Sequence, residues 1–142
     1  MEKKIIMQKN KIFDKIIKFK KPITIEKFTD LCLYSKSGYY TNANVIGRSG
    51  DFTTAPEISQ LFGEIIGLYI YDFWQNKINK PFNLIELGPG NGTLLMDVLR
   101  INNKFNKFRE NINIELIEKN INLISKQKNY LIKNKLEINK IV

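Results

Sequence analysis

The sequence has no histidine and a single cysteine, Cys32, among its 142 residues. Without histidine the chain lacks the commonest metal ligand and the commonest general base, so we expect no metal site. One cysteine excludes an intramolecular disulfide, as is usual in a reducing compartment. No apolar run approaches the roughly 20 residues of a membrane span, so we expect no transmembrane segment.

Recognisable targeting signals are also missing. The first residues lack the uninterrupted apolar region of a secretory signal. They are rich in lysine, whereas transit peptides are rich in arginine and serine and poor in acids. These absences predict a bacterial cytoplasmic protein and make a mitochondrial location less favoured.

Positive charge dominates the composition, with 23 Lys and Arg against 14 Asp and Glu and a formal net charge of +9. That balance suits a nucleic-acid-binding protein, but nearly all the cations are lysine and no known nucleic-acid-binding motif is present. Isoleucine, lysine and asparagine are all over-used, which indicates A- and T-rich codons. We therefore expect no nucleic-acid partner, and a nucleic-acid-binding protein is the weakest alternative.

The most informative segment runs from Leu84 to Leu95 and reads Leu-Ile-Glu-Leu-Gly-Pro-Gly-Asn-Gly-Thr-Leu-Leu. It predicts a parallel strand, a sharp turn at alternating glycines, and a helix from Thr93 to Ile101. Glycines adopt backbone angles closed to other residues and let a ligand approach the main chain; here they are Gly88, Gly90 and Gly92. The N-terminus of the helix would favour a carboxylate or another anion.

The spacing of the glycines distinguishes between cofactors. A dinucleotide fingerprint would place its third glycine where the chain has Thr93, and no Gly-Lys-Ser/Thr triplet of a phosphate-binding loop occurs. The pattern suits S-adenosylmethionine, whose carboxylate could meet the glycine amides while Glu86 faces its positive charges. A glycine turn without any ligand is the alternative.

A second acid follows the next predicted strand, which begins at Ile112 and ends at Glu118. In a βαβ half an acid at this strand end accepts hydrogen bonds from ribose hydroxyls, which makes Glu118 a candidate cofactor ligand. The alternatives are that it caps the following helix or is only solvated. Between the two strands, residues 102–111 pattern as a polar loop after the helix.

The segment before the first strand begins with Thr54-Ala-Pro-Glu57, the pattern of a capping box with proline in the first turn. It predicts one helix through Phe73 that packs its apolar face on the sheet. Capping is the favoured interpretation of Glu57. In the alternative, Asp51 and Glu57 line the methyl-transfer pocket and orient the group that accepts the methyl.

Upstream, we expect a short helix from Thr24 to Leu33 and a lysine-rich amphipathic helix within residues 1–21. The latter pattern fits a basic surface helix better than a membrane-surface or partner helix. We assign residues 1–52 to a helical accessory region and 53–142 to the start of the cofactor-binding domain.

Two segments together resemble the MidA-like family of class I S-adenosylmethionine-dependent methyltransferases. They are Gly50-Asp-Phe-Thr-Thr-Ala-Pro-Glu-Ile-Ser-Gln-Leu-Phe-Gly-Glu64 and Glu86-Leu-Gly-Pro-Gly-Asn-Gly-Thr-Leu94, within a resemblance that covers about residues 20 to 125. It implies protein arginine methylation, in mitochondria of a subunit of respiratory complex I during assembly of that complex. The family usually carries arginine where this chain has Asn91, and a longer, proline-containing loop where it has Ser35-Lys-Ser37.

The resemblance implies a Rossmann-like α/β domain of which the chain holds only the N-terminal portion, with about two strands of a parallel sheet. After Glu118 we expect one helix and a further strand within residues 136–142. Such a portion would be inactive alone and could need a separately encoded C-terminal half. A non-catalytic remnant or interaction module of the same fold is the second hypothesis.

Overall fold

The computed structural model describes residues 11–42, 45–47, 50–102, 104–133 and 140–141. Packing divides the chain into two compact units, Met1–Val45 and Ile46–Val142. The residues 46–52 belong to the second unit. The assignment of accessory and cofactor-binding regions with a boundary after residue 52 stays a prediction.

The first unit is helical. It contains a helix over residues 11–17, α2 (Ile25–Leu33) and α3 (Tyr39–Asn42). Thr24 caps α2, because its hydroxyl accepts the backbone N–H of Lys27 at 3.2 Å. The helix predicted from Thr24 to Leu33 is therefore confirmed, whereas residues 1–10 of the predicted amphipathic helix lie outside the described part of the chain.

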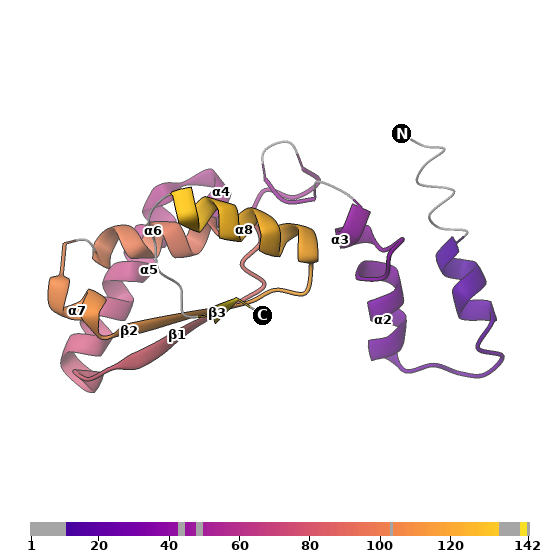
Figure 1. The fold of residues 1–142 in the computed structure, drawn as a ribbon, viewed down its shortest axis with the longest axis horizontal. Coiled ribbons are helices and arrows are strands. Elements are labelled where there is room, and N and C mark those ends of the chain that lie inside the picture. The colour runs from indigo at the N-terminus through magenta and orange to yellow at the C-terminus, as the bar shows by residue number, and fades with distance from the viewer. Residues whose placement is uncertain (1–10, 43–44, 48–49, 103, 134–139, 142) are drawn as a thin grey trace. The chain divides into compact units, whose positions relative to one another are not determined.

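The second unit is an α/β structure (Figure 1). Its elements are α4 (Ala55–Ile58), α5 (Gln60–Phe73), the π-helical turn η1 (Trp74–Ile78), β1 (Phe82–Leu87), α6 (Thr93–Asn102), α7 (Asn106–Glu110), β2 (Ile112–Ile117), α8 (Ile121–Lys133) and β3 (Lys140–Ile141). The strands form a parallel sheet in the order β1-β2-β3. The parallel sheet and the strand–glycine turn–helix unit are as predicted, and β3 adds a short third strand.

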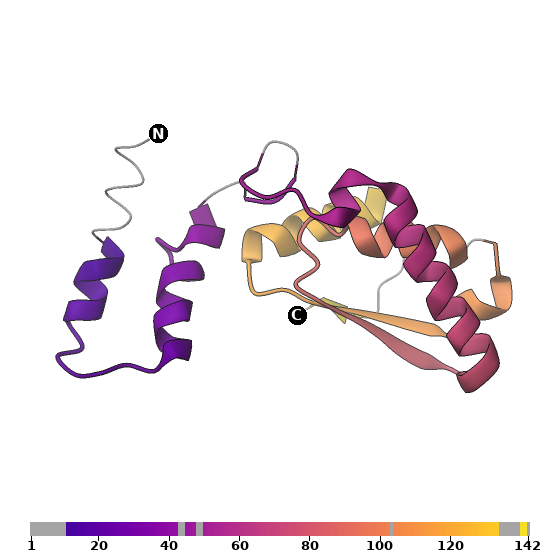
Figure 2. The ribbon, with the colours of Figure 1, turned by 180° about the vertical axis from the view of Figure 1, so that it is seen from behind.

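The hydrophobic core lies between the sheet and the helices α6 and α8, which cover one face of it (Figure 2). Its buried members come from both helices and from β2, and they are Leu95, Leu99, Ile114, Leu116 and Leu131. Parallel strands bury apolar side chains against the helices that connect them. This packing holds the carboxyl ends of β1 and β2 side by side, with Leu87 opposite Ile117.

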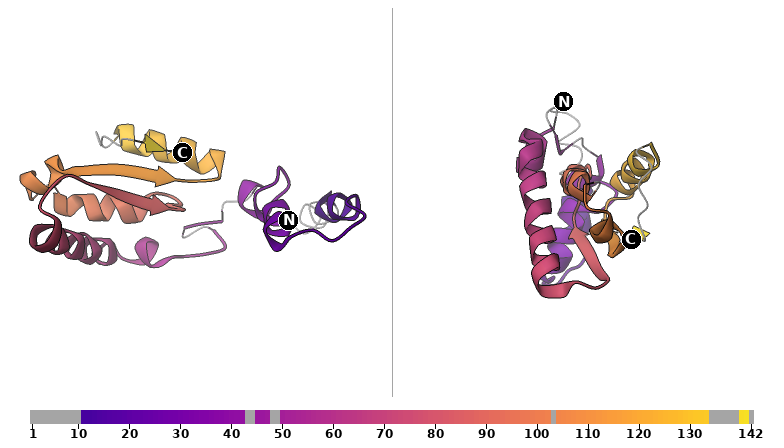
Figure 3. Two further views of the ribbon diagram at one scale, coloured as in Figure 1. Left: turned by 90° about the horizontal axis from the view of Figure 1, so that it is seen from below. Right: turned by 90° about the vertical axis from the view of Figure 1, so that its left-hand side faces the viewer.

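The other face of the sheet is bare in the described part of the chain (Figure 3). Three apolar side chains lie on it and are largely exposed: Ile85 at 50%, Leu87 at 74% and Ile117 at 45%. Parallel sheets normally carry helices on both faces, so the second unit exposes a surface that this fold usually covers. The outer edge of β1 is also without a strand partner among the described residues.

The prediction of one continuous helix from Thr54 to Phe73 that packs on the sheet is wrong in two respects. It breaks at Ser59, which has an extended backbone, so α4 and α5 are separate. It also packs against α6 rather than the sheet, and it does so through glycines: a Cβ on Gly63 would lie 2.5 Å from Cβ of Asp97. Glycine lets two helix backbones approach closely, so the larger apolar side chains of α5 stay exposed.

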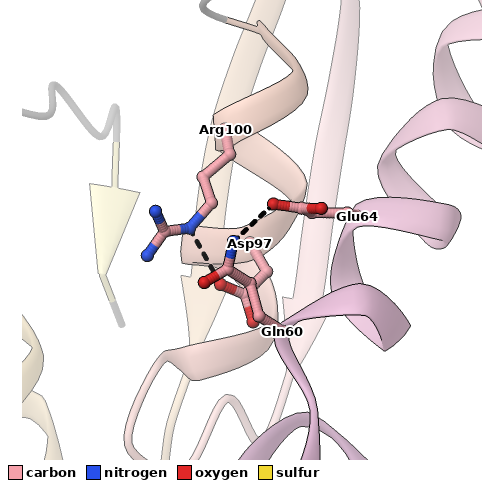
Figure 4. Close-up of polar contacts among 4 residues, drawn as sticks. All are labelled: Gln60, Glu64, Asp97 and Arg100. Atoms are coloured by element: carbon pink, nitrogen blue, oxygen red, sulfur yellow. Dashed lines mark hydrogen bonds and ion pairs between the residues drawn. The ribbon is translucent and has the colours of Figure 1, made fainter.

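Polar pairs flank this α5–α6 contact (Figure 4). On α5, Gln60 Nε2 donates to Glu64 Oε1 at 2.6 Å. On α6, Arg100 Nε lies 3.1 Å from Oδ1 of Asp97, whose side chain is buried. The ion pair compensates the carboxylate that close helix packing removes from water.

Residues 102–111, predicted to be a polar loop, contain the short helix α7. Its Phe108 is fully buried. The ring packs within 6 Å, centroid to centroid, of Tyr71, Trp74 and Phe82. The loop prediction failed because these ring contacts join residues that are far apart in the sequence.

Candidate functional site

The glycine loop, defined as Gly88–Gly92, connects β1 to α6. Its three glycines have φ angles of +64°, +56° and +81°, in the left-handed region that favours glycine. Gly88 N–H donates to the carbonyl of Ile117 at 2.8 Å, and Gly92 N–H donates to that of Pro89 at 2.7 Å. The turn predicted from the glycine spacing is therefore present and is attached to the end of β2.

The surroundings of the three glycines differ. A Cβ on Gly88 would meet none of the described residues within 4 Å, whereas one on Gly90 would lie 3.1 Å from Cδ1 of Ile46. A Cβ on Gly92 would approach only the side chain of Gln127, at 3.9 Å. Among the three, Gly88 therefore faces open space that a ligand could occupy. Position 90 requires glycine because its φ angle is positive and because the side chain of Ile46 leaves little room for a Cβ.

Glu86 is the last half-buried residue of β1 before the loop. Burial disfavours the charged carboxylate and raises the pKa of Glu86 from 4.5 to about 7. A positive charge beside it would favour ionisation. The site therefore fits a cationic group better than an anionic one at this position.

Glu118 follows β2 at the same end of the sheet as the glycine loop. Its Oε1 accepts the backbone N–H of Asn120 at 2.8 Å. Asn120 in turn caps α8, because its Oδ1 accepts the N–H of Asn122 at 2.9 Å. Glu118 thus binds the backbone of the residue that caps α8 and does not cap that helix itself, and its contact with a ribose stays a prediction.

Glu57 does not form the predicted capping box. Thr54 is the N-cap of α4 but its side chain makes no cap hydrogen bond. Instead, Oε1 of Glu57 accepts the hydroxyl of Thr93 at 2.6 Å and Nδ2 of Asn91 at 3.2 Å. The capping prediction was wrong because these partners, more than thirty residues away, hold the carboxylate at the glycine loop.

Asp51 belongs to the described residues 46–47 and 50–52, among which Ile46 and Phe52 form a parallel β-bridge. Asp51 is exposed. The carbonyl of Ile46 accepts Nδ2 of Asn91 at 3.2 Å, which attaches this segment to the glycine loop. Asp51 and Glu57 therefore both come from segments in contact with the loop.

Sequence analysis missed Gln127, a buried residue of α8. Its Nε2 donates to the carbonyl of Gly90 at 2.7 Å, while its Oε1 is buried without a hydrogen-bond partner in the described structure. The only sequence signal was a polar residue on an otherwise apolar helix face. Gln127 therefore supports the glycine loop through the carbonyl of Gly90.

Two negative findings apply to the described residues. They hold no cluster of three or more Cys, Asp or Glu side chains that could bind a metal ion. Nor do they include a helix of the length and hydropathy needed to cross a membrane.

The sequence was compared with protein families and curated proteins. Residues 65–141 match a family described as putative S-adenosyl-L-methionine-dependent methyltransferase. The chain is 42% identical, over 70% of its length, to the mitochondrial protein arginine methyltransferase NDUFAF7 of Bos taurus, and 44% identical over 63% to the Drosophila melanogaster homolog. It spans only 23% and 21% of these relatives.

A solved structure has the same fold. It is a methyl transferase candidate from Burkholderia thailandensis bound to S-adenosyl-homocysteine, with a TM-score of 0.69 and 20% identity. The match covers 90% of this chain and 34% of that one. At this identity the likeness shows the fold alone.

The relatives overturn the predicted location. They are mitochondrial proteins of animals, which contradicts the prediction of a bacterial cytoplasm. A single cysteine and the lack of a long apolar run do not distinguish the two compartments. On the match to more than half of its residues, the chain belongs to the family of putative S-adenosyl-L-methionine-dependent methyltransferases.

Proposed function

We propose that this chain is part of a methyltransferase that binds S-adenosylmethionine and acts on arginine of a protein substrate. The observation that carries the proposal is the glycine loop, with three left-handed glycines and open space at Gly88. The names of the relatives support the choice of arginine as acceptor. S-adenosylmethionine would supply an activated methyl group, so no metal or covalent intermediate on the protein is required.

Each candidate residue has a binding role in this proposal. The backbone at Gly88 accommodates the cofactor because no side chain fills that space. Glu86, whose pKa is raised to about 7 by burial, ionises opposite the cofactor's positive charge. Glu118 accepts hydrogen bonds from the ribose while keeping its bond to Asn120.

The acceptor would be oriented by carboxylates. A guanidinium binds a carboxylate through two parallel hydrogen bonds, which fixes the direction of its nitrogen atoms. We assign the acceptor contact to Asp51, which is exposed, and to Glu57, whose Oε1 is held in place by Asn91 and Thr93. Alignment of nitrogen, methyl and sulfur is then the main contribution of the protein to the rate.

Calorimetric titration of the chain with S-adenosylmethionine tests the cofactor assignment. We expect saturable binding by the native chain and none by Gly88→Val, since the new side chain would fill the open space. Ile85→Val on the bare face of the sheet is the matched control. Equal binding by Gly88→Val and the native chain would refute the assignment.

The described residues leave one face of the sheet bare and the outer edge of β1 unpaired, which favours a second possibility, a non-catalytic remnant or interaction module of the same fold. Doubly wound sheets continue beyond their first strand in the order 3-2-1-4-5-6, so additional strands would pair with β1. We propose that a further C-terminal part of the fold supplies them. We also propose a respiratory complex I subunit as the protein substrate.

Radiolabelled methyl transfer separates these possibilities. We expect no transfer to protein arginine by the chain alone, because half a pocket does not align donor and acceptor. Transfer should appear when the C-terminal part of a relative is added. Turnover by the chain alone would contradict the need for a second half, and no transfer by the combination would favour a non-catalytic module.

A further inference from the structure

The described residues 46–47 and 50–52 form a second loop, which contacts the glycine loop through Ile46 and Gly47. The side chain of Ile46 packs beside Gly90, where a Cβ would come within 3.1 Å of Cδ1. The loop closes on itself, because Gly47 N–H donates to the carbonyl of Phe52 at 3.0 Å and Gly50 N–H donates to that of Gly47 at 2.8 Å. It brings Asp51 to the same end of the sheet as the glycines.

Asn91 joins this loop to the rest of the site. Its Nδ2 donates to two oxygens, the carbonyl of Ile46 and Oε1 of Glu57, each at 3.2 Å. An amide nitrogen has two hydrogens, so both donors are used. Glu57 also accepts the hydroxyl of Thr93 at 2.6 Å, and a hydrogen bond to a carboxylate is stronger than one between neutral groups.

The backbone of the loop is built around this contact. Gly47 is buried and has a φ of +109°, which side chains rarely allow. A Cβ there would lie 3.3 Å from Nδ2 of Asn91 and 3.7 Å from Oε2 of Glu57. The close approach of loop and amide therefore depends on glycine at this position.

We propose that Asn91 and Glu57 are a positioning pair that orders residues 46–47 and 50–52, Asp51 among them, against the glycine loop before any ligand binds. The pair need not touch the ligand. A site whose wall is already ordered binds more tightly than one whose wall must order first, because apparent affinity falls with the fraction of competent molecules. The ligand part rests on the proposed function, whereas the ordering of the loop does not.

The test uses the whole chain and the variant Asn91→Leu, which keeps a similar size and removes both donors. Asn113→Leu is the matched control, since Nδ2 of Asn113 donates to Oδ1 of Asn83 on the sheet, away from the loop. Hydrogen exchange should be at least tenfold faster at the amides of Gly47 and Gly50 in Asn91→Leu only. The amide of Gly88 should exchange as in the native chain.

Titration with S-adenosylhomocysteine provides the second readout. If the ordered fraction falls to about a tenth, the dissociation constant should rise about tenfold in Asn91→Leu and stay unchanged in Asn113→Leu. If Asn91→Leu does not fold, the isosteric Asn91→Asp replaces it. That variant places a carboxylate beside Glu57 and should release the loop in the same way.

Unchanged exchange at Gly47 and Gly50 would overturn the proposal, because the pair would then not order the loop. Faster exchange at these amides with unchanged affinity for S-adenosylhomocysteine would overturn the claim that the pair positions the ligand site. If the native chain binds no S-adenosylhomocysteine, the proposed function fails instead, and the exchange measurement alone decides whether Asn91 and Glu57 order the loop.

Discussion

Glu86 offers a test that links the stability of the fold to the proposed cofactor. Burial raises the pKa of this carboxyl from 4.5 to about 7, so the folded protein binds a proton at pH values where the unfolded chain has lost it. The stability from this group is complete below pH 4.5 and is lost as the pH rises through about 7. Replacing Glu86 by glutamine removes the titration and should stabilise the protein above pH 7.

The size of the effect follows from the rise in pKa. A change from 4.5 to about 7 corresponds to at most about 3–4 kcal/mol in the free energy of unfolding. Glu86 is only half-buried, and solvent screening reduces this to about 1–2 kcal/mol. The difference in stability between Glu86→Gln and the native chain should therefore be near zero at pH 4 and about 1–2 kcal/mol at pH 8.

Urea unfolding followed by circular dichroism at pH 4, 6 and 8 measures this difference. Glu110→Gln, at the exposed end of α7, controls for the change in net charge. If Glu86→Gln loses stability with rising pH to the same extent as the native chain, the buried carboxyl does not titrate as described. Affinity for S-adenosylmethionine should rise through pH 7 in the native chain and be flat in Glu86→Gln.

Three further predictions concern single sites. Gly88→Ala should leave most of the fold intact, at a cost of about 1–2 kcal/mol for its left-handed backbone. It should weaken S-adenosylmethionine binding in calorimetry, since its Cβ would enter the open space where we propose that the cofactor binds. Gly63→Ala should lower the free energy of unfolding by about 1–3 kcal/mol, because its Cβ would overlap that of Asp97; unchanged stability would contradict the α5–α6 packing. Glu118→Ala should lower stability by about 0.5–2 kcal/mol through loss of its bond to Asn120. A loss of about tenfold in affinity for S-adenosylmethionine in the folded fraction of Glu118→Ala would support the predicted contact with the ribose. Unchanged affinity would show that Glu118 has a structural role only.

Local sequence determined the centre of this structure. The chain has a glycine at every second residue from Gly88 to Gly92, after an apolar strand and before an amphipathic helix. Few structures other than a strand–turn–helix unit fit this pattern, because the backbone angles and the periodicity are properties of neighbouring residues. The two strands, α6 and the position of Glu86 at the end of β1 followed from the same short-range patterns.

The tertiary structure alone decided which partners the remaining residues have. Thr54-Ala-Pro-Glu57 has the pattern of a capping box, yet Glu57 binds Asn91 and Thr93, because a carboxylate held between two donors from another segment is more stable than one at an exposed helix start. The glycines of α5 allow that helix to pack closely against α6. The aromatic rings that surround the buried Phe108 stabilise a short helix, α7, in a segment with a polar sequence. These outcomes depend on contacts between residues distant in the sequence, and no local pattern records them.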